Sequence, residues 1–99
     1  MKTLDELKLI LDKQKEHIIT AFDVAEIGIF GSYATSKQTE KSDIDIIVEF
    51  KKGSKTFDNY MGLKLYLEDL FESKVDLVSK HSIRQELKQS ILSGTIYVF

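Results

Sequence analysis

The sequence contains no cysteine and only two histidines, His17 and His81. Without cysteine the chain can form neither a disulfide framework nor a thiolate metal site. The histidines are too far apart in sequence to indicate a zinc-binding pair, and we interpret both as surface residues. A protein that needs no disulfides fits the reducing cytoplasm, which is the location we expect.

The sequence also lacks a long apolar run and an excess of positive charge. No apolar stretch approaches the roughly 18 residues of a membrane span, and the charged N-terminal turn does not resemble an export signal. We therefore expect no membrane association. Fourteen basic and 16 acidic residues are well mixed and give a net charge of −2. With no basic stripe to release counterions, direct binding of nucleic acid is not expected.

The length and the remaining composition indicate one globular domain. The chain has 99 residues, of which 42% are hydrophobic and 30% charged, so we predict a single domain over residues 1–99. A chain of this size buries only about 60 to 70% of the surface that its unfolded form exposes. Its core is modest, and a homo-oligomer or hetero-oligomer would add to it.

Hydrophobic periodicity predicts an α/β (α+β) fold. A capping-box pattern at Thr3 to Glu6 opens the first helix, and polar loops separate most of the later elements. The predicted helices are residues 3–21, residues 57–72, and a last helix that Ser82 to Gln85 caps and Gly94 ends. The predicted strands are residues 25–30, 43–50 and 74–78, followed by an extended apolar tail over residues 95–99. This order fits a mixed three- to four-stranded sheet with helices mainly on one face.

Two carboxylates alternate with apolar residues at the start of the second predicted strand. Asp43 and Asp45 flank Ile44, and successive side chains of a strand point to opposite faces. The two aspartates therefore share one face, with their Cβ atoms about 6 to 7 Å apart. Oxygen ligands at this spacing suit one or two hard cations such as Mg²⁺.

A Gly-Ser pair stands where the first predicted strand ends. At Gly31 the missing side chain lets backbone N–H groups approach an anion, and the hydroxyl of Ser32 adds a donor. A helix that starts at this turn would contribute a favourable dipole. The sequence thus predicts donors for a triphosphate beside acceptors for the metal ions that neutralise it.

The pattern of Gly31-Ser32, a ten-residue spacer and Asp43-Ile44-Asp45 resembles the nucleotidyltransferase superfamily of the DNA polymerase β type. The resemblance covers nearly the whole chain and implies the nucleotidyltransferase fold. It also implies a third carboxylate on a later strand, which Asp76 supplies, although Asp76 could instead cap the following loop. The sequence departs from the family pattern at Thr35 and Ser36, where relatives frequently carry a basic residue and then glycine.

The short length resembles the minimal nucleotidyltransferases of this superfamily. That resemblance implies two Mg²⁺ ions held by Asp43, Asp45 and Asp76, with Gly31 and Ser32 binding the phosphates of ATP. It further implies an antitoxin that transfers AMP to a tyrosine of a HEPN-type toxin. The alternative is a binding-only antitoxin that masks its partner. Transfer to a small molecule is disfavoured, because such relatives carry an additional helical domain.

Overall fold

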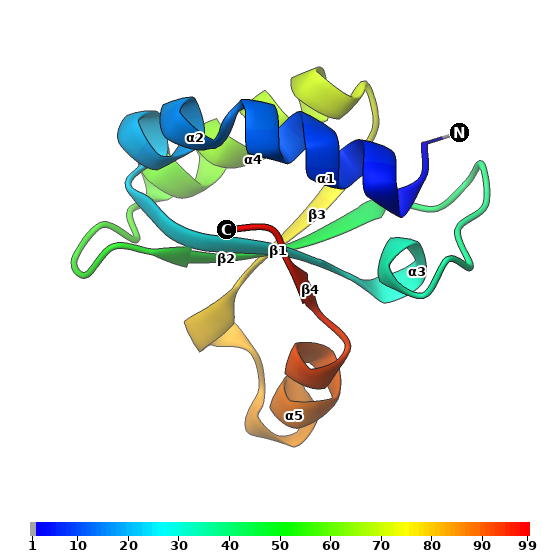
Figure 1. The fold of residues 1–99 in the computed structure, drawn as a ribbon. Helices are drawn as coiled ribbons and strands as arrows, with labels where there is room; N and C mark the ends of the chain where they lie inside the picture. The colour runs from blue at the N-terminus through cyan, green and yellow to red at the C-terminus, as the bar shows by residue number, and fades with distance from the viewer. Residues whose placement is uncertain (1) are drawn as a thin grey trace.

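The computed structural model describes residues 2–99 and contains a four-stranded mixed sheet (Figure 1). The strands are β1 (Val24–Phe30), β2 (Ile44–Phe50), β3 (Val75–Ser79) and β4 (Ile96–Tyr97), in the order β3-β2-β1-β4. Strand β1 is antiparallel to β2 and to β4, whereas β2 and β3 are parallel. The predicted extended tail is thus an edge strand.

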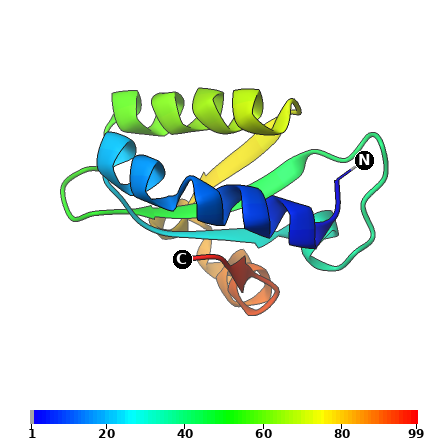
Figure 2. The ribbon, with the colours of Figure 1, turned by 45° about the horizontal axis from the view of Figure 1, so that its top comes forward.

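Three helices cover one face of the sheet, as Figures 1 and 2 show. They are α1 (Leu4–Lys13), α2 (Lys15–Phe22) and α4 (Phe57–Phe71). The short helix α3 (Gly31–Ala34) follows β1 directly, and η1 (Lys80–Ser82) and α5 (Gln85–Ser93) lie on the opposite side of the sheet. The predicted fold class, an α/β fold with helices mainly on one face, is confirmed.

Apolar side chains at alternate positions of the strands pack against these three helices and form the core. In β2 the side chains of Ile44, Ile46 and Val48 are almost completely buried, which leaves the intervening residues on the opposite face. The helical side of the core is made of side chains at helical spacing, namely Leu7, Leu11, Ile18, Leu63, Leu67 and Phe71. The face that carries the aspartates is therefore the one that this core does not cover.

Two predictions about the helices are wrong, namely the continuity of the first helix and the capping residue of the last. The first helix is interrupted at Gln14, whose side chain accepts a hydrogen bond from the Tyr66 hydroxyl at 2.8 Å. The last helix begins after Arg84 with no side-chain cap. Ser82 does not cap it, because Ser82 lies in η1 and its hydroxyl accepts a hydrogen bond from the Lys55 ammonium group. In both cases a residue distant in sequence supplies the competing partner.

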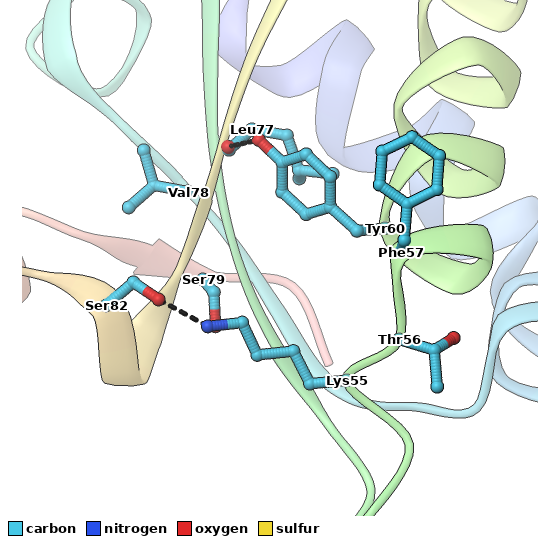
Figure 3. A pocket seen from close by; sticks show the side chains of 8 residues that line it. All are labelled: Lys55, Thr56, Phe57, Tyr60, Leu77, Val78, Ser79 and Ser82. Atoms are coloured by element: carbon cyan, nitrogen blue, oxygen red, sulfur yellow. Dashed lines mark hydrogen bonds between the residues drawn. The ribbon is translucent and has the colours of Figure 1, made fainter.

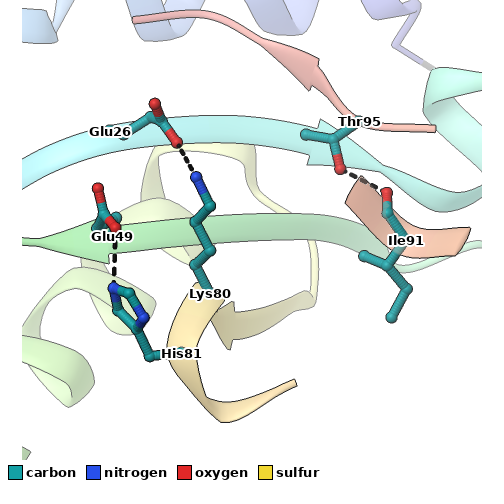
Figure 4. Close-up of polar contacts among 6 residues, drawn as sticks. All are labelled: Glu26, Glu49, Lys80, His81, Ile91 and Thr95. Atoms are coloured by element: carbon teal, nitrogen blue, oxygen red, sulfur yellow. Dashed lines mark hydrogen bonds and ion pairs between the residues drawn. The ribbon is translucent and has the colours of Figure 1, made fainter. Parts of the chain in front are cut away.

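Polar contacts fix η1 against the second face of the sheet, and a local hydrogen bond between Thr95 and Ile91 closes the end of α5 (Figure 4). Lys80 forms an ion pair with Glu26 at 3.1 Å, and the His81 ring contacts Glu49 at 2.8 Å. Because the two glutamates are paired across β1 and β2, these partners reduce the repulsion between them. None of the helices in residues 2–99 is both long and apolar enough to cross a membrane.

Candidate active site

Strand β2 places Asp45 between the two other strands that carry predicted site residues. Asp45 lies opposite Phe30 of β1 and in register with Asp76 of β3. Asp43 immediately precedes β2. All three carboxylates therefore lie at one end of the sheet, on the face opposite the core, as alternation and register require.

The carboxylate of Asp45 is destabilised in its charged form. Partial burial, together with repulsion by Asp76 and Asp43, raises its pKa to about 6. None of the three aspartates has a basic partner among the ion pairs of residues 2–99. The negative charge at this end of the sheet is thus left for a ligand to neutralise.

The three side chains do not form a ready-made metal cage. Within the described part of the chain, no three histidine, aspartate or glutamate side chains are grouped closely enough to hold a metal ion. The donor set still fits a hard divalent cation, because it consists of carboxylate oxygens that repel one another and lack a cationic side chain. Asp43, Asp45 and Asp76 are the residues that would hold it.

Gly31 packs directly against the Asp45 carboxylate. A Cβ atom at this position would lie 2.0 Å from Asp45 Oδ2, and the backbone has a φ of +72°, a conformation that favours glycine. Sequence reasoning explained Gly31 by the approach of phosphate. The structure adds a second reason, because any side chain here would displace a predicted metal ligand.

Ser32 lies in the first turn after β1, but helix α3 is only four residues long. Such a short helix contributes little dipole, so phosphate binding here would depend on backbone N–H groups and the Ser32 hydroxyl. The Thr35 hydroxyl donates to the carbonyls of Ser32 at 3.2 Å and Gly31 at 3.4 Å. Ser36, at the position where the resemblance puts glycine, has a φ of +58°.

Sequence reasoning missed the structural role of Ser42, which precedes Asp43. The Ser42 hydroxyl accepts a hydrogen bond from the Thr39 N–H at 2.9 Å, and the Ser42 N–H donates to the Thr39 carbonyl at 3.0 Å. These bonds close a tight turn just before the aspartates. A serine three residues after a threonine in a polar loop is the sequence signal for such a turn.

Two cavities differ in whether predicted site residues line them. A cavity of about 430 Å³ lies along β3, where the Tyr60 hydroxyl donates to the Leu77 carbonyl (Figure 3). None of the predicted site residues lines it. A smaller cavity of about 300 Å³ includes Gly31 in its wall and extends to the end of α5. Sequence reasoning did not find this second cavity.

A mixed sheet that brings a Gly-Ser turn against paired aspartates is the arrangement expected of an enzyme that transfers nucleotidyl groups. The family model for the nucleotidyltransferase domain matches residues 7–98. The chain is 38% identical to the protein adenylyltransferase MntA of Thermococcus cleftensis, over 99% of this chain and 98% of that protein. Relatives in Methanocaldococcus jannaschii reach 48% identity.

Solved structures show the same fold. A structure described provisionally as a minimal nucleotidyltransferase superposes with a TM-score of 0.82 at 28% identity, covering 96% of this chain and 95% of that one. One chain from the complex of a tri-AMPylated Shewanella oneidensis HEPN toxin with MNT antitoxin gives a TM-score of 0.66 at 21% identity, covering 93% of this chain and 71% of that one. The chain belongs to the nucleotidyltransferase domain family. It is a nucleotidyltransferase of minimal size.

Proposed function

We propose that this protein is an antitoxin that transfers AMP from ATP to a tyrosine hydroxyl of a HEPN-type partner protein. The observation that carries the proposal is that Asp43, Asp45 and Asp76 lie at one end of one sheet face, with Gly31 packed against the Asp45 carboxylate. Phosphate donors and metal ligands then lie at the same end of one sheet face. ATP and the partner would meet there, in the cytoplasm.

In this proposal Gly31 and Ser32 bind the phosphates, and the three aspartates hold two Mg²⁺ ions. When bound, Mg²⁺ neutralises the triphosphate and lowers the pKa of the acceptor hydroxyl. Asp45 must be ionised to take part, and its pKa of about 6 allows this at neutral pH. The acceptor oxygen bonds to the α-phosphorus as the bond to pyrophosphate breaks, and the hydroxyl proton is released.

A partner protein is the source of the acceptor in this proposal. The names of two similar proteins support this choice. The Thermococcus cleftensis relative is named a protein adenylyltransferase, and the Shewanella oneidensis complex with this fold contains a HEPN toxin that is tri-AMPylated. We therefore place the acceptor tyrosine on a HEPN-type protein.

Peptide mapping by mass spectrometry tests the proposal. Wild-type protein, Mg-ATP and a HEPN-type partner protein should yield a partner tyrosine that carries AMP, and EDTA should abolish the product. Asp43→Asn should also abolish it, because the variant lacks a charged ligand for the metal. A partner that remains unmodified with wild-type protein and Mg-ATP would refute the proposed reaction.

A binding-only antitoxin is the second candidate, and exposed apolar side chains favour it. Phe57 and Leu65 of α4 are 78% and 59% exposed, and Leu9 of α1 is 56% exposed. Such side chains are suited to a protein interface. Masking by contact would need neither ATP nor the aspartates, and this difference separates the two candidates.

A further inference from the structure

A cavity of about 300 Å³ borders the candidate active site, and two separate parts of the chain form its walls. One part is the end of β1 with α3, and the other is the C-terminal end of α5. The lining residues are Phe30, Gly31, Thr35, Ser90, Ile91 and Gly94. Because Gly31 also packs against the carboxylate of Asp45, the cavity begins next to the proposed reaction centre.

The far wall of the cavity is held in place by hydrogen bonds at the end of α5. The Thr95 hydroxyl donates to the Ile91 carbonyl at 2.7 Å (Figure 4), and the Ser93 hydroxyl donates to the Ser90 carbonyl at 3.2 Å. Residues 96–97 then pair with β1. The same strand, β1, therefore leads into one wall and anchors the other, so the cavity is preformed.

Gly94 is a glycine that the fold itself does not require. Its φ is −94°, which any residue can adopt. A Cβ atom at Gly94 would approach nothing closer than 3.6 Å, an ordinary contact. By contrast, Gly31 is required by both its backbone conformation and its contact with Asp45. The absence of a side chain at Gly94 has one evident effect, which is to leave the cavity open.

The volume and lining of the cavity suit a flat aromatic ring. Its volume is at the lower end of the range of about 300–1,000 Å³ for small-molecule sites, so it holds part of a ligand. Phe30 and Ile91 supply apolar surface, while the two glycines allow a ring to lie close to the backbone. Ser90, which also lines the cavity, adds a hydroxyl that can hydrogen-bond a heteroaromatic edge.

We propose that this cavity binds the base of the donor nucleotide. The inference rests on the proposed function, in which the phosphates bind at the Gly31-Ser32 turn. A ligand whose phosphates contact Gly31 reaches the cavity directly, because Gly31 is part of its wall. The acceptor tyrosine belongs to another protein and is not linked to the phosphates at Gly31, so nothing leads it into this cavity. Gly94 and Ile91 are thus residues that determine affinity for the nucleoside part of ATP.

Calorimetric titration with two probes, Mg-ATP and Mg-tripolyphosphate, tests the inference. Gly94→Leu should weaken binding of Mg-ATP by about tenfold or more, the effect of losing one stacked base. Binding of Mg-tripolyphosphate, which has no base, should change less than about twofold. Gln89→Leu is the matched control, because it places the same leucine side chain on α5 at an exposed position that does not line the cavity. It should leave both affinities unchanged.

A smaller substitution keeps the inference testable if the leucine variant misfolds. Gly94→Ala adds one methyl group in ordinary contact distance and should weaken Mg-ATP binding in the same direction but to a lesser extent. If Gly94→Leu weakens both probes equally, or weakens neither, the inference is wrong. It is also wrong if only the Michaelis constant for the partner rises, since the cavity would then hold the acceptor. A wild-type protein that binds neither probe would refute the proposed function itself.

Discussion

At the scale of single residues, Asp45 couples the electrostatics of the site to the stability of the fold. Its pKa is raised from 3.8 to about 6, chiefly by burial and then by Asp76 and Asp43. A folded state that holds a proton more tightly than the unfolded state is favoured at low pH. The stabilisation is therefore complete below about pH 4 and is lost as the pH rises through about 6.

Asp45→Asn removes this loss of stability, because the amide cannot ionise. In EDTA at pH 7 the variant should be more stable than wild type by about 1–2 kcal/mol, after allowance for solvent screening of a partly exposed group. The difference should shrink toward zero near pH 4. Urea denaturation between pH 4 and 7.5 measures it, and a wild-type protein that gains stability relative to the variant as the pH rises would contradict the electrostatic origin.

Gly31 offers a second test at the residue scale, with Gly53 as a matched control. Both glycines have positive φ values, +72° and +79°, so alanine costs roughly 1–2 kcal/mol at either position. Only at Gly31 does the new methyl group meet the Asp45 carboxylate, whereas nothing lies within 4 Å at Gly53.

Gly31→Ala should therefore reduce AMP transfer by about 100-fold or more, the effect of displacing a reacting group by about 1 Å. Gly53→Ala should carry the same backbone strain without the clash and should retain transfer. Single-turnover kinetics with labelled ATP, alongside thermal denaturation, provide both readouts. Equal losses of transfer in the two variants would mean that the contact between Gly31 and Asp45 has no functional role.

At the scale of secondary structure elements, most helices and strands follow from the sequence, because periodicity and turn residues are local signals. The alternation of Asp43 and Asp45 with buried isoleucines correctly predicts that both aspartates leave the core. What could not be predicted depends on contacts distant in sequence. Tyr66 bonds to Gln14 at the helix break, and the pairing of β4 with β1 brings α5 to the cavity beside Gly31.

The C-terminal end of α4 gives a prediction at this scale. Glu72 ends the helix with a φ of +52°, where glycine is the preferred residue, and its N–H is hydrogen-bonded to the Asp69 and Glu68 carbonyls. Glu72→Gly should raise the free energy of unfolding by about 1 kcal/mol. Lys64→Gly, in the interior of the same helix, should lower it by about 0.5–1 kcal/mol. If both glycines destabilise, measured by urea denaturation, the strain assigned to Glu72 is wrong.

At the scale of the whole molecule, the main core and the candidate active site lie on opposite faces of the sheet. The three helices on one face bury the main core, and the aspartates lie at the end of the opposite face. Substitutions of the aspartates should therefore leave the core intact while they change the chemistry of the site. This separation makes the aspartate variants suitable for deciding between an enzyme and a binding module.

Protection of the partner at substoichiometric concentration tests the central claim, which is that this protein acts by catalysis. With ATP and Mg²⁺, one wild-type molecule should silence the ribonuclease activity of many HEPN-type partner molecules, because an enzyme turns over. The Asp43→Asn, Asp45→Asn double variant should give no protection under the same conditions. Protection that needs neither ATP nor the aspartates, and that saturates at one equivalent, would contradict the enzymatic assignment and favour masking by contact.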